Sequence, residues 1–376
     1  MEKPSNKEEE ISAEFALGDA LDNICQYFKI RDLINVSLVC KSWQETAKRE
    51  IAKRGPERVL IPHIYCGDIR NGDSSFHVYD FLSAEPYVAI LFVGPSLRER
   101  NNERILEFKI LRAYKKYFPH HLIAVGVDES MMDEEVINSC PGMLGAPNGI
   151  LGLFLPKHRD LTIKVASCIY NRSVSFAEKI IEDISPDDKQ LKSTLIIFCN
   201  SYQGYSLATR VLKHIKKRFV QKMYTLWGGV FDDDLKAIDC PTVNSIDNPK
   251  TAIFALSITG SNLESWSVVI DCRIKKQEVN EKLFYLRDNL RLRRRTIGLA
   301  CGPRYVEDLS KNSHENMYLN SHELMHVIKK IFSRIPFISI FNYGYHSHFG
   351  VDSISDDGKQ ELAHQMAISL MILTYD

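Results

Sequence analysis

The stretch Phe15–Arg49, FALGDALDNICQYFKIRDLINVSLVCKSWQETAKR, decides how this chain begins to fold. A first apolar set recurs at steps of three and four, the spacing of one helix face: Leu17, Leu21, Ile24 and Phe28. Two further apolar stretches follow, one at Leu33, Val36 and Val39 and one from Cys40 past Trp43 to about Arg54. Gly55-Pro56 ends the helical pattern. We therefore predict three short helices over residues 11–55, after a polar lead-in at residues 1–10 that we expect to be disordered.

A bundle of this size has too little interior for all of its apolar side chains. Leu17, Ile24 and Phe28 form one set, and a second set is Leu38, Val39 and Trp43. Domains of about 40 residues are marginal alone and usually lean on a partner. One apolar set is therefore expected to dock on another protein, with Trp43 as the aromatic anchor.

Three pieces of this stretch resemble an F-box: Arg31-Asp32-Leu33, Ser37-Leu38-Val39-Cys40-Lys41 and Trp43. The sequence departs from the usual Leu-Pro opening, since Ala16-Leu17 stands there. The resemblance implies binding to a Skp-type adaptor and, through it, to a cullin and a RING protein. The residues expected at the adaptor interface are Leu17, Leu21, Ile24, Phe28, Leu33, Leu38, Val39, Cys40 and Trp43.

After Pro56 short apolar runs alternate with amphipathic stretches, which indicates an α+β or α/β architecture with two sheet-containing halves that divide near residue 245. The predicted strands are 59–64, 87–93, 122–127, 150–154, 195–198, 224–227, 252–258, 267–271, 296–300 and 335–341. The predicted helices are 100–117, 206–219, 277–289, 321–333 and 360–373.

Three strand ends that carry glycine resemble motifs of the FIST (F-box and intracellular signal transduction) domains. They are 226–232 (LWGGVFD), 296–304 (TIGLACGPR) and 335–344 (IPFISIFNYG). The resemblance implies a FIST N-like domain at 56–245 and a FIST C-like domain at 246–376. Because glycine turns leave backbone groups open, we expect target proteins to bind at Trp227, Gly228, Gly229, Cys301, Arg304, Tyr343 and Gly344.

The composition excludes several classes of partner. The 376 residues hold 48 basic and 48 acidic side chains, so no global charge favours nucleic acid or a membrane surface. No apolar run approaches the roughly 20 residues that span a bilayer. The nine cysteines are scattered, which favours free thiols in a reducing compartment, and we expect a cytoplasmic and nuclear protein.

Several patterns suggest other chemistry. His322-Glu323-Leu324-Met325-His326 matches HExxH, but a helical wheel puts both histidines opposite the apolar face and beside lysines, so we expect no metal site and no protease. Cys301 is the best nucleophile candidate, although no partner acid or histidine is identifiable and an unreactive thiol in a turn is the favoured interpretation. The basic run Arg291–Arg295 is either a localisation or docking patch or a solvated helix end.

Together these patterns predict a non-catalytic substrate receptor of a ubiquitin ligase, with no cofactor. An alternative remains open, in which the FIST region binds a small ligand and serves as an intracellular sensor.

Overall fold

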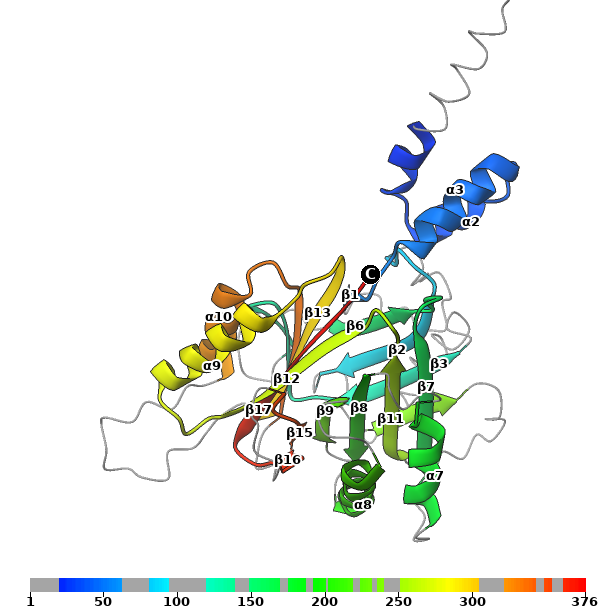
Figure 1. Ribbon diagram of the computed structural model, residues 1–376. Coiled ribbons are helices and arrows are strands. Elements are labelled where there is room, and N and C mark those ends of the chain that lie inside the picture. Colours follow the sequence, from blue (N-terminus) through cyan, green and yellow to red (C-terminus); the bar gives the residue numbers. More distant parts are fainter. Residues whose placement is uncertain are drawn as a thin grey trace, which may run out of the picture.

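The computed structural model describes residues 20–62, 81–94, 120–138, 149–169, 175–186, 192–200, 202–218, 224–231, 235–239, 251–303, 321–342, 348–353 and 361–376. Its first element is a small helical unit, residues 20–54, which comprises a helix at 20–25, α2 (Ile30–Val36) and α3 (Lys41–Ala52). Figure 1 shows α2 and α3 projecting from one end of a larger body of sheets, close to the C-terminus. The prediction of three short helices before Gly55 is confirmed within the described residues.

The body contains three sheets. The first has the order β1-β6-β2-β3-β10: β1 (Glu57–Pro62), β6 (Gly149–Pro156), β2 (Pro86–Val93), β3 (His121–Gly126) and β10 (Leu235–Asp239). The second has the order β16-β15-β9-β8-β11-β7: β16 (Ala363–His364), β15 (His348–Gly350), β9 (Tyr224–Phe231), β8 (Ser193–Asn200), β11 (Thr251–Thr259) and β7 (Thr162–Ile169). The third has the order β12-β17-β13-β14-β4-β5: β12 (Glu264–Asp271), β17 (Ala367–Tyr375), β13 (Arg295–Pro303), β14 (Phe337–Asn342), β4 (Glu129–Met132) and β5 (Glu135–Asn138).

One face of each sheet contributes to a shared central core. Phe92 of β2, Phe198 and Trp227 of the second sheet, and Leu299 and Met371 of the third all belong to this cluster. Alternate residues of the same strands point away from it. This two-sided burial explains why the strands read as continuous apolar runs rather than as alternating patterns.

Helices cover the outer faces of two sheets (Figure 1). Helices α7 (Ser175–Ile184) and α8 (Tyr202–Arg218) pack on the second sheet, where Ala208 and Val211 share a cluster with Leu195 and Ile197. Helices α9 (Lys276–Asn289) and α10 (Ser321–Ile331) cover the third sheet. The α+β class is confirmed. No helix among the described residues is long and apolar enough to cross a bilayer.

Strands from both sides of residue 245 share sheets. In the second sheet β11 pairs with β7 and β8, and in the third sheet β4 pairs with β14. Among the described residues 57–376, strands from the two sides of residue 245 are therefore neighbours in the same sheets. The assignment of 56–245 and 246–376 to two FIST-like domains stays a prediction.

Three predictions of local structure were wrong. The predicted helix 360–373 is instead β16 and β17, and β17 is buried along its whole length between β12 and β13. The strand predicted to end at Trp227 continues through Gly228 and Gly229 to Phe231. The strand predicted to end at Ala300 continues through Cys301 to Pro303. The predicted helix 100–117 lies outside the described residues.

Candidate functional site

The helical unit carries most of the exposed large apolar side chains. Of the eight that the described residues expose, five lie between residues 24 and 39: Ile24, Tyr27, Ile34, Leu38 and Val39. Tyr27 is 81% exposed, Leu38 78% and Val39 61%. Leu38 and Val39 occupy the turn between α2 and α3, where their amides donate to the carbonyl oxygens of Asn35 and Val36. Exposure of large apolar side chains to water costs free energy that binding to a partner would recover. Residues 24–27 and 34–39 therefore form the candidate binding surface.

Other residues predicted at the adaptor interface build the inside of the helical unit. Leu21 and Leu33 are buried in its core with Cys25, Val36 and Ala47. Phe28 and Trp43 are half-buried and pack against the same cluster. Cys40 is exposed at the N-cap of α3, and Leu17 lies outside the described residues.

Tyr27 and Ile34 were missing from the predicted interface. Ile34 directly follows Leu33, and both are apolar residues of one short helix. Only the packing of the three helices determines which of the two faces inward. Their apolar character, next to Phe28 and Leu33 that were predicted at the interface, was the available signal.

Arg54 holds the unit together at the end of its first helix. One guanidinium nitrogen lies 3.2 Å from the carbonyl oxygen of Cys25, 3.0 Å from that of Gln26 and 3.3 Å from that of Phe28. The same nitrogen lies 3.0 Å from a carboxylate oxygen of Glu50 on α3. The exposed apolar segments therefore sit on a unit whose helices are tied to one another.

The predicted substrate-binding residues that the structure describes lie in the middle of the body. Trp227 is 0% exposed, and its indole Nε1 donates to the carbonyl oxygen of Ser369 on β17 at 3.2 Å. Gly228 adopts φ +137°, and a side chain there would place its Cβ 1.9 Å from the carbonyl oxygen of Ile197. Gly229 pairs with His348 of β15. Arg304, Tyr343 and Gly344 lie outside the described residues.

Cys301 joins two sheets. Its thiol donates to the carbonyl oxygen of Gly228 at 3.0 Å, and burial raises the pKa of the thiol far above its usual range. A thiol held protonated by burial is a poor nucleophile. This geometry favours a structural role for Cys301.

The HExxH histidines lie on the exposed side of α10, as the helical wheel predicted. His322 Nε2 lies 2.8 Å from a carboxylate oxygen of Glu129, and His326 Nδ1 lies 3.4 Å from one of Glu134. The two histidines thus contact different carboxylates. Among the described residues, no three His, Cys, Asp or Glu side chains gather as a metal site.

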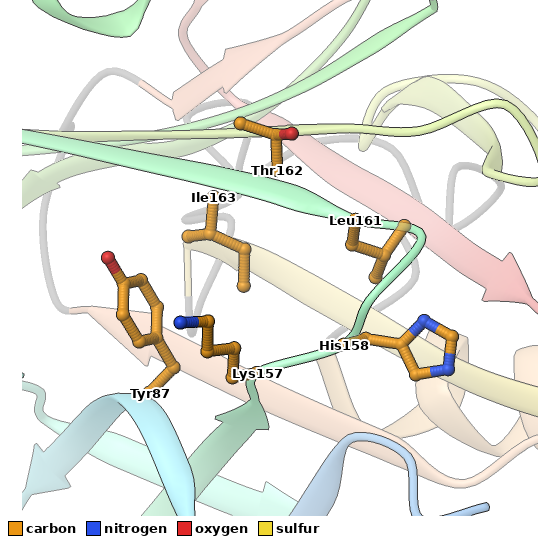
Figure 2. A pocket seen from close by; sticks show the side chains of 6 residues that line it. All are labelled: Tyr87, Lys157, His158, Leu161, Thr162 and Ile163. Atoms are coloured by element: carbon orange, nitrogen blue, oxygen red, sulfur yellow. The ribbon is translucent and has the colours of Figure 1, made fainter. Parts of the chain in front are cut away.

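A small open pocket of about 200 Å³ lies between the first and second sheets. Figure 2 shows its lining, which combines Tyr87 of β2 with the segment from the end of β6 to the start of β7: Lys157, His158, Leu161, Thr162 and Ile163. The His158 ring points away from Tyr87 and Lys157 (Figure 2) and lies 5.5 Å from the ring of Tyr375, measured between centroids. The pocket could hold only a small molecule.

Comparison with solved structures gives distant matches. Two are cyanuric acid hydrolases, one of them from A. caulinodans. They are 9% and 10% identical to this chain, each with a TM-score of 0.35. The alignments cover 85% and 86% of this chain and 99% of each hydrolase. These values are too low to carry an argument about activity.

The sequence itself gives a match to one family model. No curated protein matches the chain. The F-box domain model matches residues 19–54, the region that contains the exposed apolar segments and the tied helices described above. Residues 19–54 of this chain are therefore an F-box domain.

Proposed function

We propose that this protein is the substrate-recognition subunit of a Skp–cullin–F-box ubiquitin ligase. The observation that carries the proposal is the cluster of exposed apolar side chains at residues 24–39, inside the matched F-box. An F-box implies binding to a Skp-type adaptor, and an exposed apolar surface on a small helical unit is what such binding requires. The adaptor would link the chain to a cullin and a RING protein.

In this proposal the chain supplies proximity and no catalytic group. The F-box binds the adaptor, while the region after Pro56 binds target proteins and holds them near the ubiquitin-loaded conjugating enzyme. The arrangement resembles F-box only protein 22, in which FIST domains follow the F-box. We propose that the protein acts in the cytoplasm and the nucleus.

We propose that targets bind at the residues that follow the buried strands rather than at the strands themselves. Trp227, Gly228 and Cys301 are held inside the body by backbone contacts, so a target would reach their strand ends only through the segments that follow. The proposed contacts are Arg304, which follows β13, and Tyr343 and Gly344, which follow β14. Arg304 offers a forked donor and Tyr343 an aromatic anchor.

Cys40 gives a direct test of adaptor binding with the unmodified chain. It is exposed and directly follows Leu38 and Val39, whereas the other described cysteines are buried. An alkylating reagent should modify Cys40 readily in the free protein, and a purified Skp-type adaptor should slow that reaction. Peptide mass spectrometry separates Cys40 from every other thiol. If the two proteins co-elute in size-exclusion chromatography but Cys40 is not protected from alkylation, the interface lies elsewhere. If they do not co-elute, the ligase proposal is wrong.

A second candidate function is small-ligand sensing, favoured by the pocket in Figure 2. Lys157, Tyr87 and Thr162 could bind a small anion against the apolar Leu161 and Ile163. A thermal-shift screen of small carboxylates and phosphates, repeated with Lys157→Ala, tests it. A shift that persists in the variant would place the ligand at another site.

A further inference from the structure

Arg295 connects the F-box to the sheets. It is the first residue of β13, it is 9% exposed, and its position in the sequence is far from that of the F-box. Its Nε donates to the carbonyl oxygen of Lys53 at 3.0 Å, and its Nη2 donates to that of Ala52 at 2.7 Å. One buried guanidinium thus binds two successive carbonyls at the C-terminal end of α3.

These carbonyls are groups that a helix cannot satisfy by itself. The last carbonyls of an α-helix lack intrahelical donors and carry the negative end of the helix dipole. An arginine guanidinium satisfies these carbonyls and also complements the helix dipole, because it offers two parallel N–H donors and a positive charge. Arg295 therefore acts as a C-terminal cap for α3 that is supplied by a different part of the chain.

The Arg295 side chain is itself held in place. It lies across the ring of Tyr375, its cross-strand partner on β17, with 5.6 Å between the guanidinium carbon and the ring centroid. His158 packs against the same ring. On the side of the F-box, Gly55 leaves room for the arginine stem, since a Cβ there would lie 2.8 Å from its Cγ.

A second contact joins the start of α2 to the segment that precedes β2. The amide of Ile30, at the start of α2, donates to the carbonyl oxygen of Leu82 at 2.8 Å. Lys29 Nζ lies 3.2 Å from the carbonyl oxygen of Phe81. Two separate attachments resist rotation in a way that one cannot, so the F-box has a defined orientation on the sheets.

We propose that Arg295 is a positioning residue: it fixes the orientation of the F-box, and with it the direction in which the sheets present a bound target to the ligase. The functional half of this inference rests on the proposed ligase role. The positioning half is a property of the chain alone. Arg295 lies far from the Leu38–Val39 part of the candidate adaptor surface, because these two residues lie before the start of α3 and Ala52 lies at its end, about 18 Å away for twelve residues at 1.5 Å each.

The test measures the distance between the F-box and the sheets in the full chain. Nitroxide labels at the exposed Cys40 and at Glu178→Cys, an exposed position on α7, are read by pulsed electron paramagnetic resonance, with Cys66, Cys140 and Cys240 replaced by Ser. We expect a narrow distribution for this parent chain and a broader one for Arg295→Ala. The matched control is Arg294→Ala, which removes an exposed neighbouring arginine and should leave the width unchanged.

A second variant guards against a folding defect. Gly55→Ala keeps the arginine but displaces its stem, and it should also broaden the distribution. Circular dichroism confirms that each variant used is folded. An unchanged width in both Arg295→Ala and Gly55→Ala overturns the proposal.

The ligase arm separates this inference from the proposed function. Arg295→Ala should bind the purified Skp-type adaptor as the parent chain does, yet in the assembled ligase it should redistribute ubiquitin among the lysines of this chain itself. If the distance distribution broadens but the pattern of ubiquitinated lysines is unchanged, Arg295 orients the F-box only in the free chain. Its role in target presentation would then be overturned. Failure of the parent chain to bind the adaptor would remove the proposed function while leaving the distance result intact.

Discussion

The indole nitrogen of Trp227 and the carbonyl oxygen of Ser369 form a hydrogen bond of 3.2 Å that joins β9 of the second sheet to β17 of the third. Phe198 packs edge-on against the same indole, with 5.6 Å between ring centroids. Trp227 is thus a core residue that links two sheets. This placement separates its contribution to stability from any contribution to target binding.

Replacement of Trp227 should destabilise the whole body. We expect Trp227→Ala to lower the free energy of unfolding by about 3–5 kcal/mol, because a large buried side chain leaves a cavity. Trp227→Phe, which keeps most of the volume but removes the donor, should cost about 0.5–1.5 kcal/mol through loss of the hydrogen bond to the Ser369 carbonyl. Urea unfolding followed by circular dichroism measures both. Equal stability of Trp227→Phe and the parent chain would show that the hydrogen bond contributes nothing.

Gly228 should tolerate no side chain. At φ +137° an L-residue is strained, and a Cβ would also meet the backbone of Ile197. We expect Gly228→Ala to cost about 2–4 kcal/mol, the sum of backbone strain and overpacking. A thermal unfolding midpoint within about half a degree of that of the parent chain would contradict this, because about 1 °C per kcal/mol is expected for a chain of this length.

The contacts of the Asp133 carboxylate lead us to predict that the protein loses stability in acid. Its carboxylate lies 2.6 Å from Arg58 and 2.8 Å from Lys329, and it accepts a hydrogen bond from the amide of Phe337 at 3.1 Å. Burial by itself would raise the pKa of Asp133, but the hydrogen bonds from Arg58, Lys329 and the Phe337 amide outweigh it and hold the pKa below its ordinary value of 3.8. Because the folded pKa is the lower one, this stabilisation is complete above the unfolded pKa and is lost as pH falls through the folded pKa.

The matched variant for Asp133 is Asp133→Asn. Asparagine tolerates the left-handed φ of 58° at this position, so the substitution removes the charge and keeps the turn. We expect the parent chain to be more stable than the variant by about 2 kcal/mol near neutral pH, with the difference shrinking below about pH 5. A difference that stays constant down to pH 2 would assign the effect to something other than ionisation of Asp133.

The sequence predicted the class of the fold because its strands are long apolar runs flanked by polar turns. It failed at residues 360–373, where Leu362, Met366 and Leu370 repeat at a helical spacing of four. The run from Ala367 to Tyr375 is buried on both faces, and such a strand lacks the alternation that distinguishes strand from helix. The glycines of β9 were similarly misread, since Gly228 serves close packing inside a strand rather than a turn.

At the F-box, the sequence identified the module but could not sort its side chains. Leu33 and Ile34 are neighbours of equal hydrophobicity, yet Leu33 is in the core and Ile34 is exposed. The contact between Arg295 and α3 was also beyond sequence reasoning, because it joins residues more than 240 positions apart. A basic run at 291–295 suggested docking or localisation, while the structure turns its last member inward.

The most direct test of the account is the affinity of the purified chain for a Skp-type adaptor, measured by calorimetry for the parent chain and for Leu38→Asp with Val39→Asp. The matched control is Phe284→Asp with Leu292→Asp, which alters exposed apolar residues on and after α9. We predict that the F-box variant loses at least about thirtyfold in affinity, which corresponds to about 2 kcal/mol for a buried anchor. The control should bind as the parent chain does. Equal affinity of the F-box variant and the parent chain, or no binding by the parent chain, would contradict the account.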